Sequence, residues 1–238
     1  MHATQSCNKS MAEPSAASGT GGAPLALFDL DDTLIDRTGN FERWARGFVA
    51  ALGFAEDGPE FDWLVAADQS GSTDRHELFA ATRERFALQP SVGDLVASYS
   101  NDIARRATCD ARTVDALATL RASGWRICIV TNGFTTQQQA KIRNARLDAL
   151  VDGWVVSESI GAAKPDPLPF DHAIAICGGT RAATWMIGDD PINDIEGAWK
   201  AGLLTIWIDH GRAWTHHRCT PTHVATNAGH ACRVLLGL

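Results

Sequence analysis

The segment Leu25-Ala-Leu-Phe-Asp29-Leu-Asp31-Asp32-Thr33 is an apolar run that ends in three carboxylates within four positions. Side chains two residues apart on an extended chain point the same way, so Asp29 and Asp31 can share one side if the strand continues past Asp29. Two carboxylates this close repel each other unless a cation or a shared proton intervenes. The pattern favours a Mg²⁺ site in which one Asp is ligand and nucleophile and the other transfers protons. An acidic turn that caps the next helix is the alternative.

The composition of the whole chain narrows the classes of protein to consider. Its 238 residues allow one domain, or one domain with a large insertion. The net charge is -7 and no dense run of Lys and Arg occurs, which argues against a nucleic-acid or anionic-membrane binder. No stretch approaches the roughly 18 apolar residues that span a bilayer. We therefore expect no nucleic-acid or membrane partner. The expected oligomeric state is a monomer or a homodimer.

The N-terminal stretch and the cysteines bear on location. Residues 1–23 are rich in Ser, Ala, Gly and Thr and lack the apolar segment of a secretory signal, so we predict a disordered tail there. The six cysteines are scattered without a CxxC pair, which favours a reducing, cytoplasmic location. The His- and Cys-rich stretch from His216 to Cys232 matches no familiar zinc spacing, which disfavours a structural metal there.

Short apolar runs bounded by turn residues recur along the chain and predict buried parallel strands. Helical patterns lie between most of them, which predicts an α/β fold with a doubly wound, Rossmann-like parallel sheet. Such sheets carry their sites at the carboxyl ends of the strands, where Asp29, Thr131 and Asp189 fall. The predicted strands are Leu25–Phe28, Ile127–Val130, Trp154–Val156, Trp185–Ile187 and Leu203–Ile208, and the predicted helices are Val114–Arg121, Thr135–Ala145, Leu168–Cys177 and Asp194–Ala201.

The stretch from about Thr38 to Cys109 has a different character. Strand signals vanish there, and several amphipathic helices fit the apolar spacing, with Pro59 suited to the first turn of one of them. We therefore predict an inserted all-helical cap domain over residues 38–109. The catalytic core would then consist of residues 24–37 and 110–238.

Four separated motifs occur in order along the chain: Asp29-Leu-Asp31-Asp32-Thr33, Thr131-Asn132-Gly133, Lys164-Pro165-Asp166 and Gly188-Asp189-Asp190-Pro191-Ile192-Asn193-Asp194-Ile195-Glu196-Gly197-Ala198. Together, in this order, they resemble the haloacid dehalogenase-like (HAD) hydrolase superfamily. The resemblance covers nearly the whole chain from about Pro24 onward and includes the position of the helical cap between the first and second motifs. It implies the phosphatase branch of that superfamily and a small-molecule phosphate ester as the substrate.

The resemblance implies separate roles for the first two carboxylates. Asp29 matches the nucleophile that attacks phosphorus, forms an aspartyl-phosphate and binds Mg²⁺. A carboxylate attacks a phosphate dianion poorly unless the negative charges are screened, so the metal suits this chemistry. Asp31 matches the general acid that protonates the leaving oxygen and then, as base, activates water. Its backbone carbonyl is expected on the metal.

The second and third motifs match a phosphate-binding set. Thr131 matches the hydroxyl that binds a phosphoryl oxygen, and backbone N–H groups around Asn132 and Gly133 would complete the cradle. Lys164 matches the lysine that neutralises charge on the phosphate and the nucleophile. It is one of only four lysines in the chain, which fits a point-charge role.

The fourth motif would complete the metal site. Asp189 matches the carboxylate that binds Mg²⁺ directly, and Asp194 matches the one that orients a metal-bound water or Lys164. The predicted metal set is thus Asp29, Asp31, Asp189 and Asp194. Family members often carry a small residue after the first acid of this motif, whereas this chain has Asp190, whose role the sequence leaves open.

The sequence separates some of the chemistries that this fold supports. Dehalogenases of the superfamily lack an acid at the second position, so Asp31 argues against that branch. Phosphonate cleavage uses a cap lysine, and residues 38–109 contain none. The leading prediction is Mg²⁺-dependent hydrolysis of a small phosphomonoester, such as a nucleoside monophosphate, a sugar phosphate or phosphoglycolate. A phosphomutase or phosphotransferase, or a non-catalytic regulatory protein of the same fold, are the alternatives.

The cap of this family closes over the site and selects the leaving group, so its polar residues are candidates for substrate contact. Arg43 and Arg46 lie on the helix face opposite Phe41 and Trp44, and Arg75 and His76 lie near a helix start. A solvated helix face is the alternative explanation for each of these four residues.

Overall fold

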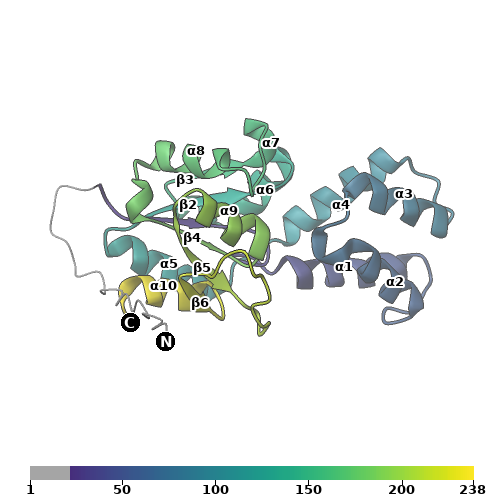
Figure 1. The fold of residues 1–238 in the computed structure, drawn as a ribbon. Helices are drawn as coiled ribbons and strands as arrows, with labels where there is room; N and C mark the ends of the chain where they lie inside the picture. The colour runs from purple at the N-terminus through teal and green to yellow at the C-terminus, as the bar shows by residue number, and fades with distance from the viewer. Residues whose placement is uncertain (1–21) are drawn as a thin grey trace, which may run out of the picture.

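Parallel strands form the centre of this protein, in a computed structural model that describes residues 22–238 (Figure 1). The sheet has six strands in the order β3-β2-β1-β4-β5-β6, and each neighbouring pair is parallel. The predicted doubly wound parallel sheet is confirmed. The predicted tail lies almost entirely outside the described residues. In chain order the strands are β1 Leu25–Phe28, β2 Arg126–Thr131, β3 Gly153–Val156, β4 Thr184–Gly188, β5 Leu204–Ile208 and β6 His223–Ala225.

Helices cover both faces of this sheet because side chains alternate along its strands. Ala26 and Phe28 of β1 belong to a core shared with α5 and α10, whereas Leu25 and Leu27 belong to one shared with α8. Figure 1 shows α8 on one side of the sheet and α5 and α10 on the other. Each fully buried Leu or Phe contributes about 1.5–3 kcal/mol. The core helices are α5 Ala111–Ala122, α6 Thr135–Asn144, α7 Ser157–Ile160, α8 Leu168–Cys177, α9 Gly197–Lys200 and α10 Ala228–Leu236.

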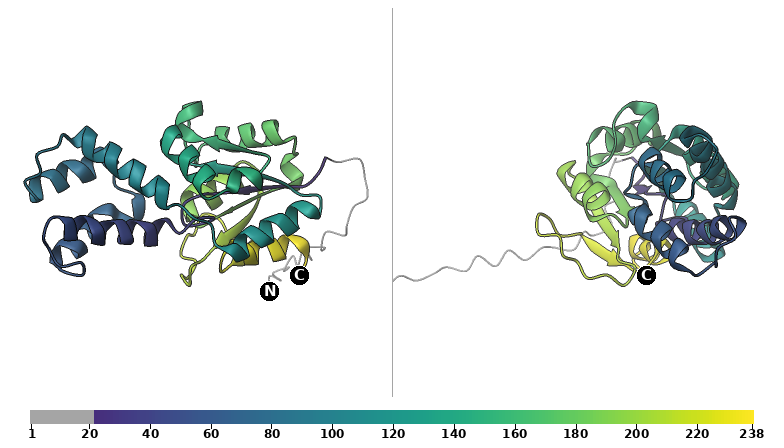
Figure 2. Two further views of the ribbon diagram at one scale, coloured as in Figure 1. Left: turned by 180° about the vertical axis from the view of Figure 1, so that it is seen from behind. Right: turned by 90° about the vertical axis from the view of Figure 1, so that its right-hand side faces the viewer.

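A second group of helices stands beside the sheet and is joined to it through α1 and α4 (Figures 1 and 2). Its own core is aromatic, with the Trp44 and Tyr99 ring centroids 4.8 Å apart in an edge-to-face arrangement. Asn144 of α6 donates to the backbone oxygen of Ala104, 2.7 Å away, and so ties α4 to the sheet domain. The predicted limits of the cap, residues 38 and 109, stay a prediction. These helices are α1 Arg37–Ala51, α2 Pro59–Asp68, α3 Arg75–Arg85 and α4 Val92–Arg106.

The structure differs from the expected elements in several segments, including α7, which was not predicted. The helix expected over Asp194–Ala201 begins earlier, as a π-helical turn over Pro191–Glu196 that continues into α9. The cause is Asp190, whose carboxylate accepts hydrogen bonds from the N–H groups of Ile192 and Asn193. The C-terminal stretch, for which no element was predicted, contains β6 and α10. Within residues 22–238, no helix is both long and apolar enough to cross a membrane.

Candidate active site

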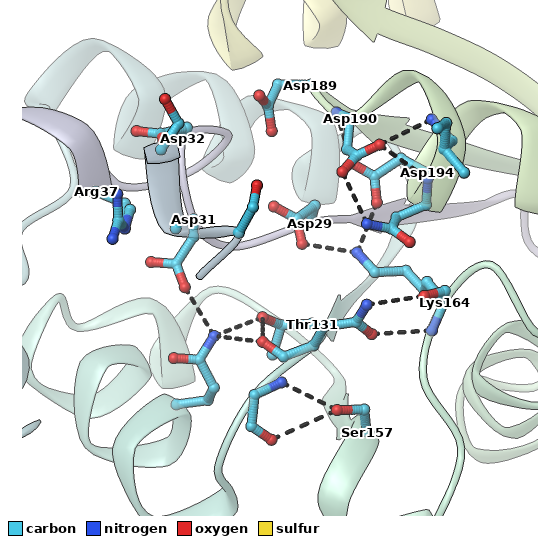
Figure 3. Close-up of a pocket in the computed structure, with 18 of the residues that line it drawn as sticks. Asp29, Asp31, Asp32, Arg37, Thr131, Ser157, Lys164, Asp189, Asp190 and Asp194 are labelled. Atoms are coloured by element: carbon cyan, nitrogen blue, oxygen red, sulfur yellow. Dashed lines mark hydrogen bonds and ion pairs between the residues drawn. The ribbon is translucent and has the colours of Figure 1, made fainter. Parts of the chain in front are cut away.

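The predicted site residues gather at the carboxyl ends of β1, β2 and β4 (Figure 3). Asp29 directly follows β1, Thr131 is the last residue of β2, and Asp189 directly follows β4. Because β1 lies between β2 and β4, loops far apart in the sequence open onto one edge of the sheet. These residues line a cavity of about 920 Å³ whose walls come from both the sheet domain and the cap.

Three carboxylates form a compact cluster in this cavity. Asp29, Asp189 and Asp194 each place a carboxylate oxygen within 4.8 Å of the other two. Gly188 permits this approach, because a Cβ at that position would lie 2.2 Å from Asp194 Oδ2. Clustered carboxylate oxygens are the ligands that hard divalent cations such as Mg²⁺ prefer. The donor set therefore fits the metal that the sequence predicts, with the Asp31 side chain outside the cluster.

Lys164 is the buried cation that contacts the three-carboxylate cluster. Its Nζ donates to Asp29 Oδ1 at 2.7 Å, to Asp194 Oδ1 at 2.6 Å and to the backbone oxygen of Val130 at 2.7 Å. The Asn132 side chain fixes the Lys164 backbone, since it donates to Lys164 O and accepts from Lys164 N, both at 2.9 Å. The Asn132 side chain thus helps to position Lys164. The Thr-Asn-Gly motif did not predict this contact.

Burial and mutual repulsion raise the pKa values of the clustered carboxyl groups. Burial is the main cause for Asp29, whose pKa rises to about 7 although Lys164 opposes the rise. Burial, followed by the charges of Asp29 and Asp194, raises the pKa of Asp189 to about 8. Burial also raises the pKa of Asp194 against the effect of Lys164. Lys164 and the exposed Arg212, whose Nη2 lies 3.3 Å from Asp189 Oδ2, do not balance three carboxylates, so the cluster needs a further cation to be fully ionised.

Asp31 makes a separate set of contacts on the other side of the cavity. Lys141 Nζ, from α6, lies 2.8 Å from both Asp31 oxygens, and Gln138 Nε2 donates to Oδ2 at 2.8 Å. Burial would raise the pKa of Asp31, but Lys141 and then Gln138 outweigh burial and lower it. The strand ends at Phe28, so Asp29 and Asp31 are not two successive residues on one face of a strand.

The Thr-Asn-Gly motif lies at the cavity with several of its groups already bonded. The buried Thr131 hydroxyl accepts a hydrogen bond from Gln138 Nε2 at 2.7 Å. The N–H of Gly133 donates to Ser157 Oγ at 3.0 Å, and Gly133 has a φ of +140°, which glycine adopts readily. If a phosphate binds at this turn, its oxygens therefore have to displace Ser157 Oγ from the Gly133 N–H or share that N–H with it.

The alternative interpretation of the opening acidic segment, a turn whose carboxylates cap the next helix, fits Asp32 and not Asp29 or Asp31. Asp29 and Asp31 face the cavity, whereas Asp32 accepts hydrogen bonds from Thr38 N at 2.8 Å and Thr38 Oγ1 at 2.7 Å. Asp36 caps α1 through Gly39 N. Asp190, whose role the sequence left open, caps the Pro191–Glu196 turn and is not part of the three-carboxylate cluster.

Several residues at the cavity were not predicted from the sequence. Gln138 and Lys141 contact Asp31. They lie three residues apart on the helix that follows Thr131 and therefore on one helix face, which is the one signal in the sequence that could have pointed to them. Arg212 Nη2 lies 2.8 Å from the backbone oxygen of Asp189, and Arg37 lines the cap side. Of the four cap candidates, Arg75 lines this cavity, and Arg43, Arg46 and His76 do not.

Comparison with known proteins settles the family. Residues 24–202 match the family model of the haloacid dehalogenase-like hydrolases. This match covers most of the chain, and the protein belongs to the HAD-like hydrolase family. The resemblance drawn from the four motifs is confirmed.

Individual relatives include phosphatases and nucleotidases. The chain is 34% identical to the pyrimidine 5'-nucleotidase YjjG of Escherichia coli K12 over 152 residues, which cover 63% of this chain and 64% of that protein. It is 28% identical to the phosphoserine phosphatase of Thermus thermophilus over 222 residues, which cover 79% of this chain and 89% of that protein. The chain thus spans slightly less than two thirds of the nucleotidase.

Solved structures of the family share the fold. The HAD hydrolase YfnB of Bacillus subtilis, solved with bound magnesium, superposes with a TM-score of 0.77 and 22% sequence identity. The superposition covers 91% of this chain and all of YfnB. At that identity the likeness concerns the fold alone.

Proposed function

We propose that this protein is a Mg²⁺-dependent phosphomonoester hydrolase that works through an aspartyl-phosphate on Asp29. The observation that carries the proposal is the set of contacts made by Lys164, whose Nζ joins Asp29 and Asp194 in a buried cluster with Asp189. A bound Mg²⁺ would be held by the carboxylates of Asp29 and Asp189 with the Asp31 carbonyl, while Asp194 would orient a metal-bound water or Lys164. The metal would screen the charge between nucleophile and phosphate.

In the first half-reaction Asp29 supplies the nucleophile and Asp31 the proton. An oxygen of Asp29 bonds to phosphorus, and the bond from phosphorus to the ester oxygen breaks. The departing oxygen takes a proton from the carboxylic acid of Asp31. Lys164 lies 2.7 Å from the attacking carboxylate and stabilises the negative charge on the phosphoryl group.

In the second half-reaction Asp31 acts as the base. Water gives a proton to the Asp31 carboxylate and its oxygen bonds to phosphorus, while the bond to Asp29 breaks and inorganic phosphate leaves. The contacts from Lys141 and Gln138 favour the ionised form of Asp31, which is the form that this step requires. The Thr131 hydroxyl would orient a phosphoryl oxygen during both steps.

The substrate class is a small phosphorylated metabolite. The relatives' names favour this class, since they include a pyrimidine 5'-nucleotidase, a phosphoserine phosphatase and a glyceraldehyde 3-phosphate phosphatase from Pyrococcus abyssi. A cavity of about 920 Å³ lined by both domains is large enough for a leaving group of nucleoside size or smaller.

Release of p-nitrophenol from p-nitrophenyl phosphate tests the proposal. We expect turnover in Mg²⁺, loss of turnover in excess EDTA, and recovery when Mg²⁺ is restored. Ca²⁺ should not replace Mg²⁺, because it takes more and longer oxygen ligands and would let Asp29 bind through both oxygens. Full activity after thorough removal of metal would exclude the proposed mechanism.

A further inference from the structure

The cap side of the cavity carries an ion cluster that the proposed chemistry does not use. Arg37, the first residue of α1, donates from Nη1 and Nη2 to the two oxygens of Asp68, each at 2.6 Å. Arg75, the first residue of α3, donates from Nη1 to Asp68 Oδ1 at 2.5 Å. The side chains of Arg37, Asp68 and Arg75 are 7%, 2% and 15% exposed. A single carboxylate thus holds two guanidinium groups at the cavity wall.

This cap cluster has one more positive than negative charge. Burial alone would raise the pKa of Asp68, but Arg37 and then Arg75 outweigh burial and lower it, so the Asp68 carboxylate stays ionised. Asp74 also lines the cavity, but it is exposed and its Oδ1 accepts from the N–H groups of His76 and Glu77. Across the cavity, Asp31 is already paired with Lys141. A buried excess cation is costly unless an anion joins it.

The backbone beside the cluster keeps the guanidinium groups in place. Asp68 Oδ2 accepts from the N–H of Gly71 at 2.9 Å, which folds the loop after α2 back onto the pair. Gly71 has a φ of +91°, and a Cβ there would lie 3.1 Å from Arg37 Cζ. Arg75 also stacks on Tyr99, with its Cζ 5.4 Å from the ring centroid. Burial raises the pKa of Tyr99, so its hydroxyl remains a hydrogen-bond donor.

The cluster lies where the leaving group must be. Asp31 gives its proton to the leaving oxygen, so the rest of that group extends from Asp31 away from the three-carboxylate cluster. Figure 3 shows Arg37 on the Asp31 side of the cavity, opposite Lys164. Arg37, Arg75 and Tyr99 line this part of the same cavity. Arginine donors in a fixed fork recognise carboxylate and phosphate oxygens.

We propose that Arg37, Arg75 and Tyr99, positioned by Asp68, bind a second anionic group on the leaving group of the substrate. The preferred ester would then carry a carboxylate or a second phosphate, and esters with an uncharged leaving group would be poorer substrates. This inference rests on the proposed phosphatase function and narrows its substrate class.

Matched pairs of esters test the inference with the full-length, Mg²⁺-loaded enzyme. The carboxylate arm compares 3-phosphoglycerate with glycerol 3-phosphate, and the phosphate arm compares ribulose 1,5-bisphosphate with ribulose 5-phosphate. We expect a kcat/KM advantage of about 10- to 100-fold for the charged member of at least one pair, as charge-assisted hydrogen bonds provide. The arm with the larger advantage identifies the anion.

Variants show whether the cap cluster causes that advantage. Arg75→Ala should reduce the charged-to-neutral kcat/KM ratio by about tenfold or more, Arg75→Lys should restore part of it, and Tyr99→Phe should reduce it while the ring packing is kept. Arg106→Ala, an exposed arginine of α4, is the matched control and should leave the ratio unchanged. Arg37 is not substituted, because its removal would leave the buried Asp68 carboxylate poorly compensated and would destabilise the fold.

The outcomes separate this inference from the proposed function. Equal kcat/KM for both members of both pairs, or an Arg75→Ala variant that slows both members equally, would overturn the second-anion site while p-nitrophenyl phosphate was still hydrolysed. Absence of any Mg²⁺-dependent phosphatase activity would overturn the proposed function, and the inference with it.

Discussion

Asp29 and Asp31 stand two residues apart, yet their carboxyl groups have opposite electrostatic surroundings. Burial beside Asp194 raises the pKa of Asp29 to about 7. Lys141 and Gln138, both from α6, lower the pKa of Asp31. Titratable neighbours whose environments push their pKa values apart are suited to different chemical roles. The lowered pKa of Asp31 suits the base role that we propose for the second half-reaction. Asp29 needs a bound cation to lower its pKa to the ionised form that a nucleophile requires.

Amide variants should separate these two roles. Asp29→Asn should abolish turnover with every substrate, because a neutral amide attacks phosphorus poorly and binds Mg²⁺ weakly. Asp31→Asn should slow an alkyl ester by roughly 10²–10⁴, with a smaller effect on the first step for p-nitrophenyl phosphate, whose leaving group hardly needs a proton. Rapid quench with labelled substrate should trap label on the Asp31→Asn protein and none on Asp29→Asn. Equal trapping in both variants would remove Asp29 as the nucleophile.

A glycine in the fourth motif gives a second test at the residue scale. Gly188→Ala should push Asp194 away, because the new Cβ would lie 2.2 Å from Asp194 Oδ2. We expect the Mg²⁺ concentration for half-maximal activity to rise by about tenfold or more, since one displaced carboxylate weakens the site. Titration of activity against Mg²⁺ measures the effect.

The control for this variant lies in α1. Gly47 is exposed, and a Cβ there would meet nothing within 4 Å. Gly47→Ala should stabilise the helix by up to about 1 kcal/mol and leave the Mg²⁺ titration unchanged. An unchanged titration in Gly188→Ala as well would show that Asp194 can move without loss of metal affinity.

At the scale of elements, the cap is held at its base by one carboxylate that joins three helix ends. Asp68 is the last residue of α2, Arg37 begins α1, and Arg75 begins α3. Asp68 is almost fully buried, so the pair is poorly screened by solvent and salt. Loss of one partner from such a buried cluster leaves an uncompensated charge.

Asp68→Asn should therefore destabilise the protein in a pH-dependent way. The pKa of Asp68 is lowered in the folded state, so its stabilisation is present above the unfolded value of about 3.9 and is lost as pH falls through the lowered folded value. We expect a loss of about 3–5 kcal/mol near pH 7 that shrinks below about pH 4. Urea unfolding from pH 7 to pH 3 measures this difference.

Asp62 on the same helix provides the comparison. It is exposed, and Asp62→Asn should change stability by no more than about 0.5 kcal/mol at any pH. If the Asp68→Asn penalty stayed constant down to pH 3, the charge of Asp68 would not be its source.

At the scale of the whole molecule, the three-carboxylate cluster brings the ends of β1 and β4 together at the proposed Mg²⁺ site. Asp29 follows β1, whereas Asp189 and Asp194 follow β4. Their mutual repulsion opposes folding when no metal is bound, and only the folded chain brings them together. Binding of the proposed metal would therefore add to the free energy of unfolding.

Mg²⁺ should raise the melting temperature of the protein. At 100 times its dissociation constant it would stabilise the fold by about 2.7 kcal/mol, which corresponds to roughly 5–10 °C for a protein of this size. Thermal unfolding with Mg²⁺ and with EDTA measures the shift. Asp189→Asn should reduce it, and a full shift in that variant would place the metal elsewhere.

The layout of this protein follows from local signals in its sequence. Apolar runs of strand length, separated by helical periodicity, are such signals, and β1 and α8 begin and end where those signals predict. The four motifs also depend on short-range spacing, so the residues Asp29, Thr131, Lys164 and Asp189 could be selected from the sequence alone. Their gathering at one cavity follows from the parallel topology.

The pairing of side chains depends instead on tertiary packing. Lys141 lies 110 positions from Asp31 in sequence, and Arg37 lies 31 positions from Asp68, so neither pair has a local pattern. Asp190 could not be assigned from its spacing either, because its orientation depends on the helical turn that it caps. Local periodicity reports the burial of a face, whereas pairing between buried charges depends on how separate elements pack, and the distances between those elements exist only in the folded chain.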